Sequence, residues 1–465
     1  MDYLVELGIF NIGIILSGIM IVLVFLGVRV AFAAALIGFV GITLRFMIEK
    51  EMPLYDSLYQ ALTIAGRVPY NKASIVALSL IPTFILIGYL AYHAGLTRYL
   101  FEAAKRWVGW LPGGLAVASV FATAGFAAVS GASVATSAVF ARIAIPEMLK
   151  LNYDKRFAAG VVAAGGTLAS LIPPSAILVI YATIVEESVG KLLLAGFLPG
   201  AVSALIYGGM IVCMAKFNKD LGPPVHGFTW GERFASLPGT LPIFFVIFII
   251  ISAITWGWAT PTEAGALGAV VILAMAFWHG MRWEQLSVAL LESAKLATMI
   301  FAIIFGVLIY VRFLGFADLP QAFSDWIQGL DQSPYITLLL ILLAYAVLGM
   351  FMDAIGMLLL TLPVVYPAIV ALNGGIDVSA ADSAFGMSGE FVGIWFGIIV
   401  VKMAELCLIT PPIGLNCFVV AGVRPDISVQ DVFRGVSPFF AADVATIAVL
   451  VFFPGIVLML PQLIG

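Results

Sequence analysis

The chain has 465 residues, of which 63% are hydrophobic and 10% are charged, and its formal net charge is −4. Soluble globular chains are about 45–50% apolar and about 25% charged, and a water-soluble fold of this length cannot bury so large an excess of apolar side chains. The composition therefore excludes a soluble enzyme, a nucleic-acid-binding protein, a secreted disulfide scaffold and a disordered chain. It predicts an integral membrane protein with many spans.

Apolar runs of about 20 residues, the length that crosses a bilayer as a helix, divide most of the chain into predicted spans. Residues 1–6 are acidic, whereas a secretory signal peptide begins with positive charge, so we expect the first span to be retained. The predicted spans are, in chain order, residues 8–26, 31–47, 74–93, 157–183, 192–215, 241–257, 263–280, 295–313, 391–414 and 439–461.

Two further apolar stretches, 112–149 and 335–369, are interrupted near the middle, and each could form two spans or a re-entrant hairpin. Basic residues flank the first stretch on both sides, whereas acidic residues flank the second and Lys and Arg are scarce there. Because basic loops face the cytoplasm, we interpret the first as a hairpin entering from the cytoplasm and the second as one entering from outside. The interruptions are Ser130-Gly131-Ala132-Ser133 and Gly349-Met350-Phe351-Met352-Asp353.

One long polar stretch, Lys216 to Pro238, lies near the midpoint of the chain and contains three basic residues. It predicts a cytoplasmic linker. An odd number of crossings before it makes the second half enter from the opposite side, so both termini are expected outside. The predicted units are a first inverted repeat (1–225), a linker (226–238) and a second inverted repeat (239–465).

Short motifs recur between the halves in the same order, which favours duplication over the chance recurrence expected of a chain with 46 Gly and 23 Pro. The fold prediction is an all-α polytopic membrane protein of two inverted-topology repeats, each with about five transmembrane helices and one re-entrant hairpin. Residues 373–390 form an expansion of the second half and are expected to be an exposed loop. The recurring motifs are Pro173-Pro174 with Pro411-Pro412, Gly196 and Pro199 with Gly435 and Pro438, and Ala35-Leu36-Ile37-Gly38 with Gly265-Ala266-Leu267-Gly268.

The two Pro-Pro pairs predict helices that break inside the membrane, around 172–175 and 409–414, because proline lacks the backbone donor and clashes with the preceding turn. Broken backbone at membrane depth is tolerated only where it is buried or lines a cavity. Freed carbonyls can coordinate a cation, and the following half-helix can direct its positive end at an anion. Paired interrupted segments therefore favour a solute and ion site over plain structural kinks.

Polar side chains within the apolar segments are further candidates for the site. Ser130 and Ser133 offer hydroxyl oxygens at the first hairpin tip, and Asp353 is either an intramembrane functional carboxylate or an interfacial one at a shallow loop. Lys402 and Glu405 share a helical face and are expected to pair. Arg142 and Arg312 could attract an anionic solute, although extension toward the lipid headgroups is the plainer interpretation of each.

The sequence contains no phosphate-binding GxxxxGK[ST] loop, and its three histidines are far apart, so neither ATP drive nor a His-based transition-metal centre is expected. Three cysteines in apolar runs do not form a disulfide framework. An ion gradient is the remaining drive. Na⁺ is favoured over H⁺, because carbonyl and hydroxyl ligands suit a hard cation and few carboxylates lie within spans.

Five motifs together resemble the large membrane subunit of tripartite ATP-independent periplasmic (TRAP) transporters of the dicarboxylate type, over nearly the whole chain. The resemblance implies an elevator-type, Na⁺-driven importer of organic acids in the bacterial inner membrane, with a small four-helix membrane subunit and a periplasmic solute-binding protein as partners. The motifs are Gly165-Gly166-Thr167-Leu168, Ile172-Pro173-Pro174-Ser175, Thr260-Pro261-Thr262-Glu263-Ala264, Met352-Asp353-Ala354 and Ile409-Thr410-Pro411-Pro412-Ile413-Gly414.

The resemblance also implies two sodium sites. Ala169 and Cys407 depart from the family pattern, which usually has Gly at both positions, and backbone carbonyl ligation can tolerate either change. We assign Ser133, Ser175, Asp353 and Asn416 to the solute. The first implied sodium site comprises Ser130, Gly131, Ala169, Ile172 and Pro173, and the second comprises Gly349, Cys407, Thr410 and Ile413.

Other functions remain as alternatives. A stand-alone elevator-type symporter of dicarboxylates or citrate would transport without a soluble partner. An intramembrane enzyme is disfavoured because no nucleophile–base pair is evident, and a channel because the hairpins belong to two inverted halves rather than to a symmetric pore. Hydrolysis assays and single-channel recording separate these two classes from a transporter.

Overall fold

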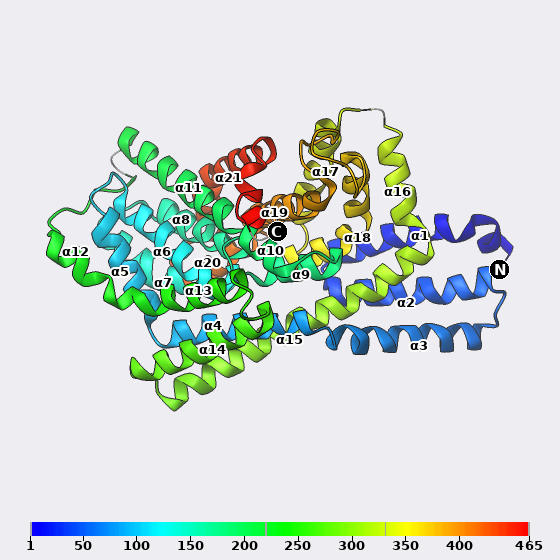
Figure 1. The fold of residues 1–465 in the computed structure, drawn as a ribbon, viewed down its shortest axis with the longest axis horizontal. Coiled ribbons are helices and arrows are strands. Elements are labelled where there is room, and N and C mark those ends of the chain that lie inside the picture. The colour runs from blue at the N-terminus through cyan, green and yellow to red at the C-terminus, as the bar shows by residue number, and fades with distance from the viewer. Residues whose placement is uncertain (1, 219–220, 331, 464–465) are drawn as a thin grey trace.

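Helices form every regular element across residues 2–218, 221–330 and 332–463, the part of the chain that this computed structural model describes (Figure 1). Nine helical segments within that part are long and apolar enough to cross a membrane. The expected all-α, polytopic architecture is therefore confirmed.

One long helix, α15, runs through the middle of the molecule, and helices from both halves of the chain pack along it (Figure 1). The backbones approach closely through small residues: a Cβ added to Gly38 would lie 2.5 Å from the backbone nitrogen of Tyr310. We call α15 and the helices packed on it, directly or through one another, the α15 layer. Its helices are α1 (Asp2–Phe25), α2 (Val30–Glu49), α3 (Leu54–Ala73), α4 (Leu80–His93), α13 (Leu241–Thr255), α14 (Pro261–Trp278) and α15 (Trp283–Phe316), with the short η1 (Val76–Ser79) between α3 and α4.

Both interrupted apolar stretches form pairs of helices joined by short tips at the expected residues. The first pair is α6 (Gly114–Ser130) and α7 (Ser133–Lys150), and the second is α17 (Pro334–Gly349) and α18 (Ala354–Asn373). Amphipathic helices α5 (Leu96–Val108) and α16 (Leu319–Gln328) precede the pairs, and we did not predict them. Residues 374–388 form turns without a helix, so the expected loop is present, although Phe385 and Met387 within it are buried rather than exposed.

Both Pro-Pro motifs interrupt helices, as predicted, and both Pro-Pro peptide bonds are cis. The helices around the first break are buried on nearly every side, as is the helix before the second. A helix that is apolar all round belongs in a core. The elements are α8 (Lys155–Thr167), η2 (Leu168–Ser170) and α9 (Ala176–Val185) in the first half, and α19 (Gly389–Cys407) and α20 (Leu415–Val423) in the second.

The remaining helices close the fold, and here some predicted boundaries were wrong. The last long helix, α21, spans Val429–Phe452 rather than 439–461, and α15 begins at Trp283 rather than 295. In both cases the first turns of the helix contain charged and polar residues, so a window that selects for high hydropathy placed the start of the helix too late in the chain. The polar linker contains a short helix, α12 (Trp230–Ser236). The others are α10 (Val189–Ala195), α11 (Phe197–Phe217), η4 (Pro238–Thr240), α22 (Gly455–Leu458) and η5 (Pro461–Leu463).

Candidate functional site

The tip of the first hairpin packs directly against the first broken helix. Gly131 adopts a left-handed conformation with φ of 56°, and a Cβ added there would lie 2.7 Å from the carbonyl oxygen of Pro174. On the same side, the Ser133 and Ser170 hydroxyl oxygens lie 2.5 Å apart. The predicted tip and break residues of the first half are therefore neighbours in space.

Each break removes the regular helical donor from one backbone carbonyl, at an equivalent place in each half. Proline cannot donate to the carbonyl four residues earlier, so Pro173 leaves the Ala169 carbonyl, and Pro411 the Cys407 carbonyl, without their regular helical donors. The Cys407 carbonyl accepts instead from the Thr410 backbone amide at 3.3 Å. In the first half the chain then restarts as α9, whose N-cap Ser175 accepts a hydrogen bond from the Leu178 backbone amide at 3.4 Å. Both carbonyls belong to residues that the family resemblance assigns to sodium.

The second hairpin approaches the second break in the same way. A Cβ added to Gly349 would overlap the Cys407 Sγ, and that thiol lies 3.7 Å from the Tyr345 carbonyl oxygen. The Thr410 hydroxyl donates to the Leu406 carbonyl at 2.6 Å. Gly349, Cys407 and Thr410 are thus gathered around the end of α19.

Two predicted residues are not brought into either cluster by their contacts. The Asp353 carboxylate caps α18 by accepting a 3.0 Å hydrogen bond from the Gly356 amide, next to Val30 at the start of α2. The side chain of Ile413 is 40% exposed at the second break. Their assignment to solute and sodium stays a prediction.

A buried amide connects the two halves at the breaks. Asn416, at the start of α20, donates from Nδ2 to the Ala163 carbonyl of α8 at 3.2 Å. Its Oδ1 and the Ser137 Oγ on α7 are buried and have no hydrogen-bond partner in the described part of the chain. Unsatisfied buried oxygens are uncommon in native folds, so each of these two atoms is a candidate contact for a ligand. Oxygen donors of this kind fit a hard alkali cation or a polar solute.

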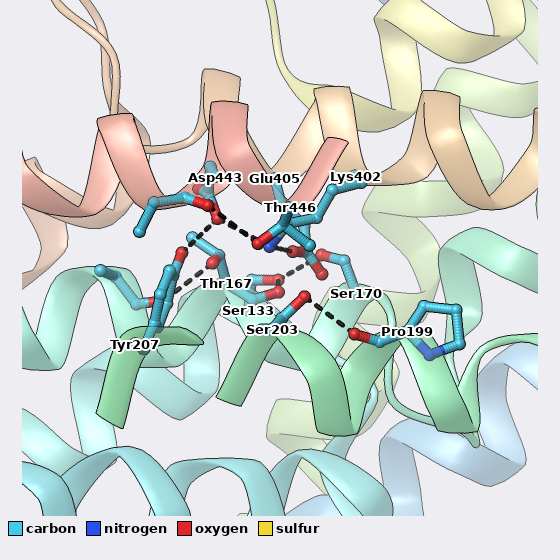
Figure 2. Close-up of polar contacts among 12 residues, drawn as sticks. Ser133, Thr167, Ser170, Pro199, Ser203, Tyr207, Lys402, Glu405, Asp443 and Thr446 are labelled. Carbon is cyan, nitrogen blue, oxygen red and sulfur yellow. Dashed lines mark hydrogen bonds and ion pairs between the residues drawn. The ribbon is translucent and has the colours of Figure 1, made fainter. Parts of the chain in front are cut away.

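A buried charged cluster lies beside Ser133 and Ser170 (Figure 2). The Lys402 Nζ is 2.7 Å from Glu405 Oε2 and 2.7 Å from Asp443 Oδ1, and all three side chains are fully buried. The Tyr207 hydroxyl donates to Asp443 Oδ1 at 2.6 Å. The predicted Lys402–Glu405 pair is confirmed, and it is part of a larger cluster that joins α11, α19 and α21.

Sequence reasoning missed Asp443, although a signal was available. It is an acid within an apolar predicted span, and acids in such positions face the protein interior and pair with a cation. Figure 2 shows Ser133, Thr167 and Ser170 between this cluster and α11. The charged cluster is therefore continuous with the polar side chains at the first break.

A small cavity of about 140 Å³ leads to the first hairpin tip. Ser130 and Ala132 of the tip line it together with Arg142 and Glu292. The Arg142 guanidinium donates to the Tyr92 hydroxyl at 3.2 Å. One of the two arginines that could attract an anion therefore faces a cavity that reaches the tip.

A partly buried acid follows the end of α9. Burial raises the pKa of the Glu187 carboxyl above its ordinary value, while the Tyr366 hydroxyl, which donates to Oε1 at 3.2 Å, acts in the opposite direction. The Tyr366 hydroxyl belongs to α18, so this contact links the first broken helix to the second hairpin.

Comparison with known proteins identifies the same family over almost the whole chain. The family model described as the DctM component of tripartite ATP-independent periplasmic transporters matches residues 17–456. The C4-dicarboxylate TRAP transporter large permease protein DctM of Pseudomonas aeruginosa is 35% identical over 387 residues, covering 83% of this chain and 86% of that protein. The 2,3-diketo-L-gulonate TRAP transporter large permease protein YiaN of Escherichia coli is 29% identical, covering 96% of this chain and 97% of that protein.

Among solved structures, the YdaH transporter of Alcanivorax borkumensis has a similar fold. The TM-score is 0.54, the sequence identity is 12%, and the match covers 86% of this chain and 89% of that chain. At this identity the likeness concerns the arrangement of helices alone.

Proposed function

Because the chain belongs to the DctM family of tripartite ATP-independent periplasmic transporters, we propose that it is the large membrane subunit of a sodium-driven importer of an organic acid. It is a transporter subunit rather than an enzyme. The observation that carries the proposal is the paired arrangement in which each half of the chain has a broken helix in contact with its own helical hairpin.

The two halves are proposed to be inverted repeats, residues 1–225 and 239–465, joined by a cytoplasmic linker at 226–238. The hairpins and broken helices would move together past α15 and its neighbours in an elevator cycle. Support comes from the order of an amphipathic helix, a hairpin and a broken helix, which both halves share, and from the burial of α8 and α19 away from the α15 layer. Both termini would lie on the periplasmic side of the inner membrane.

Sodium is the proposed coupling ion. In the first site the Ala169 carbonyl and the Ser130 hydroxyl lie at the break and at the tip that packs against it, which supports a ligand shell shared between the two elements. In the second site Gly349 and Cys407 are in contact. The remaining ligands proposed are Gly131, Ile172, Pro173, Thr410 and Ile413.

The solute is proposed to be a carboxylate that binds between the two breaks. Ser133, Ser175, Asp353 and Asn416 are the proposed contacts, and the unpartnered Asn416 oxygen can accept a hydrogen bond from a hydroxyl group of a hydroxylated acid. Relatives are named for C4-dicarboxylate and for 2,3-diketo-L-gulonate, which are both organic acids. The family also supports a separate small membrane subunit and a periplasmic solute-binding protein as partners.

Reconstitution tests this function directly. The chain is placed in proteoliposomes with the small subunit and supplied with the binding protein loaded with radiolabelled succinate or another organic acid. Uptake is expected only with an inward Na⁺ gradient and with the binding protein present. Equal uptake when K⁺ replaces Na⁺ would overturn sodium drive, and equal uptake without the binding protein would favour a stand-alone symporter.

A further inference from the structure

A large cavity lined by two arginines lies away from the tips and breaks. It has a volume of about 710 Å³ and lies where α3 and α15 meet α9 and α18. Figure 1 shows α9 and α18 on one side of this region and α15 with α3 on the other. In the proposed elevator cycle, the cavity therefore lies between the moving hairpins and broken helices and the stationary α15 layer.

The charged side chains that line this cavity in the described part of the chain are all basic. Arg67 of α3 and Arg312 of α15 line it, and its described lining includes no acidic side chain. Neither guanidinium has an ion pair or hydrogen bond among the described residues, whereas Arg45 and Arg424 each pair with a neighbouring acid. Two guanidinium groups facing one cavity raise the local concentration of anions.

The remaining lining suits a small organic anion. Asn71 and Thr183 offer hydrogen bonds, and Ile180, Leu308 and Leu359 supply apolar contacts. A volume of several hundred cubic ångströms is typical of sites for small molecules. The planar fork of arginine matches the geometry of a carboxylate, which it can bind through two parallel hydrogen bonds.

We propose that Arg67 and Arg312 form a carboxylate-binding site in this cavity, separate from Ser133, Ser175, Asp353 and Asn416. The site takes up the organic acid on its way to or from the tips. This inference rests on the proposed function, because it assumes that the carried solute is a carboxylate. In this proposal Arg312 faces the solute path.

The charge of the cavity can be measured without knowing the transported acid. Thr183→Cys is introduced into a Cys213→Ser background, since Cys407 and Cys417 are buried. In detergent, the rate of modification by an anionic methanethiosulfonate is divided by the rate for a cationic one. We expect this ratio to fall on the order of tenfold in the Arg67→Gln/Arg312→Gln double variant. Arg67→Lys/Arg312→Lys should retain most of the ratio, and Arg424→Gln should leave it unchanged.

Occupancy is measured with the same introduced thiol. Succinate, citrate and gluconate are tested for protection of this thiol from a neutral maleimide, with the uncharged diamide of succinic acid as the matched control. We expect at least one carboxylate to slow labelling, the diamide not to, and the protection to be lost in the double glutamine variant.

An unchanged reagent ratio in the double glutamine variant would overturn the proposal, and so would failure of all three carboxylates to protect. A folding defect is recognised by loss of the monodisperse peak in size-exclusion chromatography, and the single variants Arg67→Gln and Arg312→Gln, each expected to lower the ratio, then carry the test. Sodium-independent uptake with intact carboxylate protection would contradict the proposed drive while leaving this site in place.

Discussion

The Tyr207 hydroxyl of α11 donates a 2.6 Å hydrogen bond to Asp443 Oδ1 of α21, although the two residues are 236 positions apart in the chain. Lys402 shares the same carboxylate oxygen at 2.7 Å. This contact ties the last helix of the first half to the last long helix of the second, inside a fully buried cluster.

Replacing Lys402 with Met should strongly destabilise the protein. The change leaves the Glu405 and Asp443 carboxylates buried without their cation, and breaking a buried pair costs about 3–5 kcal/mol. We expect a large drop in the thermal midpoint in detergent, measured by intrinsic fluorescence. The matched control is Lys191→Met, whose partner Glu390 is exposed, and it should cost at most about 1 kcal/mol. Adding Glu405→Gln and Asp443→Asn should restore part of the loss, and a midpoint that stays low would contradict the charge argument.

Replacing Gly131 with Ala should weaken sodium coupling more than it weakens folding. The residue has a positive φ, and the new Cβ would press on the Pro174 carbonyl at 2.7 Å. Gly95→Ala is the matched control because its φ is also positive, at 75°, but nothing lies within 4 Å of the added Cβ. Both variants share the left-handed strain of roughly 1–2 kcal/mol. Only Gly131→Ala should raise the Na⁺ concentration for half-maximal uptake, by about tenfold. The same rise in Gly95→Ala would contradict a specific role of the hairpin tip in sodium binding.

The contact between Gly349 and Cys407 predicts a rescue. Gly349→Ala would overlap the Cys407 Sγ and should reduce sodium-dependent uptake by on the order of tenfold, since overpacking a buried contact costs about 1–3 kcal/mol. Cys407→Gly removes the sulfur and should return most of the activity to the double variant. The measurement is initial uptake in proteoliposomes at saturating Na⁺. An absence of coupling between the two substitutions would mean that the sulfur does not limit the geometry of this site.

Asn416 should affect solute affinity, whereas a second buried asparagine should not. Asn416→Ala removes the amide that reaches Ala163 and the unpartnered oxygen, and we expect KM to rise about tenfold with a smaller change in kcat. Asn373, which directly precedes the 374–388 loop, is equally buried and makes hydrogen bonds with Phe385 and Met387. Asn373→Ala removes both of these hydrogen bonds. That control should lower the thermal midpoint and leave KM unchanged. Equal effects of both variants on KM would argue against a solute contact at Asn416.

Glu187 should make stability depend on pH. A carboxyl whose pKa is raised by burial binds its proton more tightly in the folded than in the unfolded protein. Its ionisation therefore lowers the free energy of unfolding. This loss of stability is absent below the ordinary pKa of 4.5 and is complete once the pH has risen through the pKa of the folded protein. Glu187→Gln should therefore raise the thermal midpoint by about 1 °C at pH 8 and have no effect at pH 4. Asp377→Asn, at an exposed acid in the 374–388 loop, is the control. A stabilisation that is the same at both pH values would refute this origin.

The breaks and tips could be predicted because they depend on local chemistry. Pro173 and Pro411 lack a backbone donor wherever they are placed, and the small residues around Gly131 interrupt an apolar run visibly in the sequence. The pairing of Lys402 with Glu405 follows from helical spacing alone.

The rest depended on contacts between distant segments. The helices α3 and α5 are amphipathic, so a hydropathy window did not detect them, and their apolar faces are defined only by their neighbours. Asp443 completes the charged cluster from a helix that no short-range pattern connects to Lys402. Asp353 lies in the predicted tip, but the close approach of Gly356, whose amide it caps, to Val30 of α2 could not be derived from one sequence.

The uninterrupted length of α15 has a mechanical consequence. Its 34 residues extend about 51 Å, which exceeds the hydrocarbon thickness of about 30 Å. The rod must therefore incline or emerge from the apolar layer, and α2 and α4, which pack along different parts of it, follow its inclination. Lipids with longer or shorter acyl chains would change the tilt of α15 and of the helices packed on it. Bilayer thickness would therefore change the arrangement of the whole α15 layer.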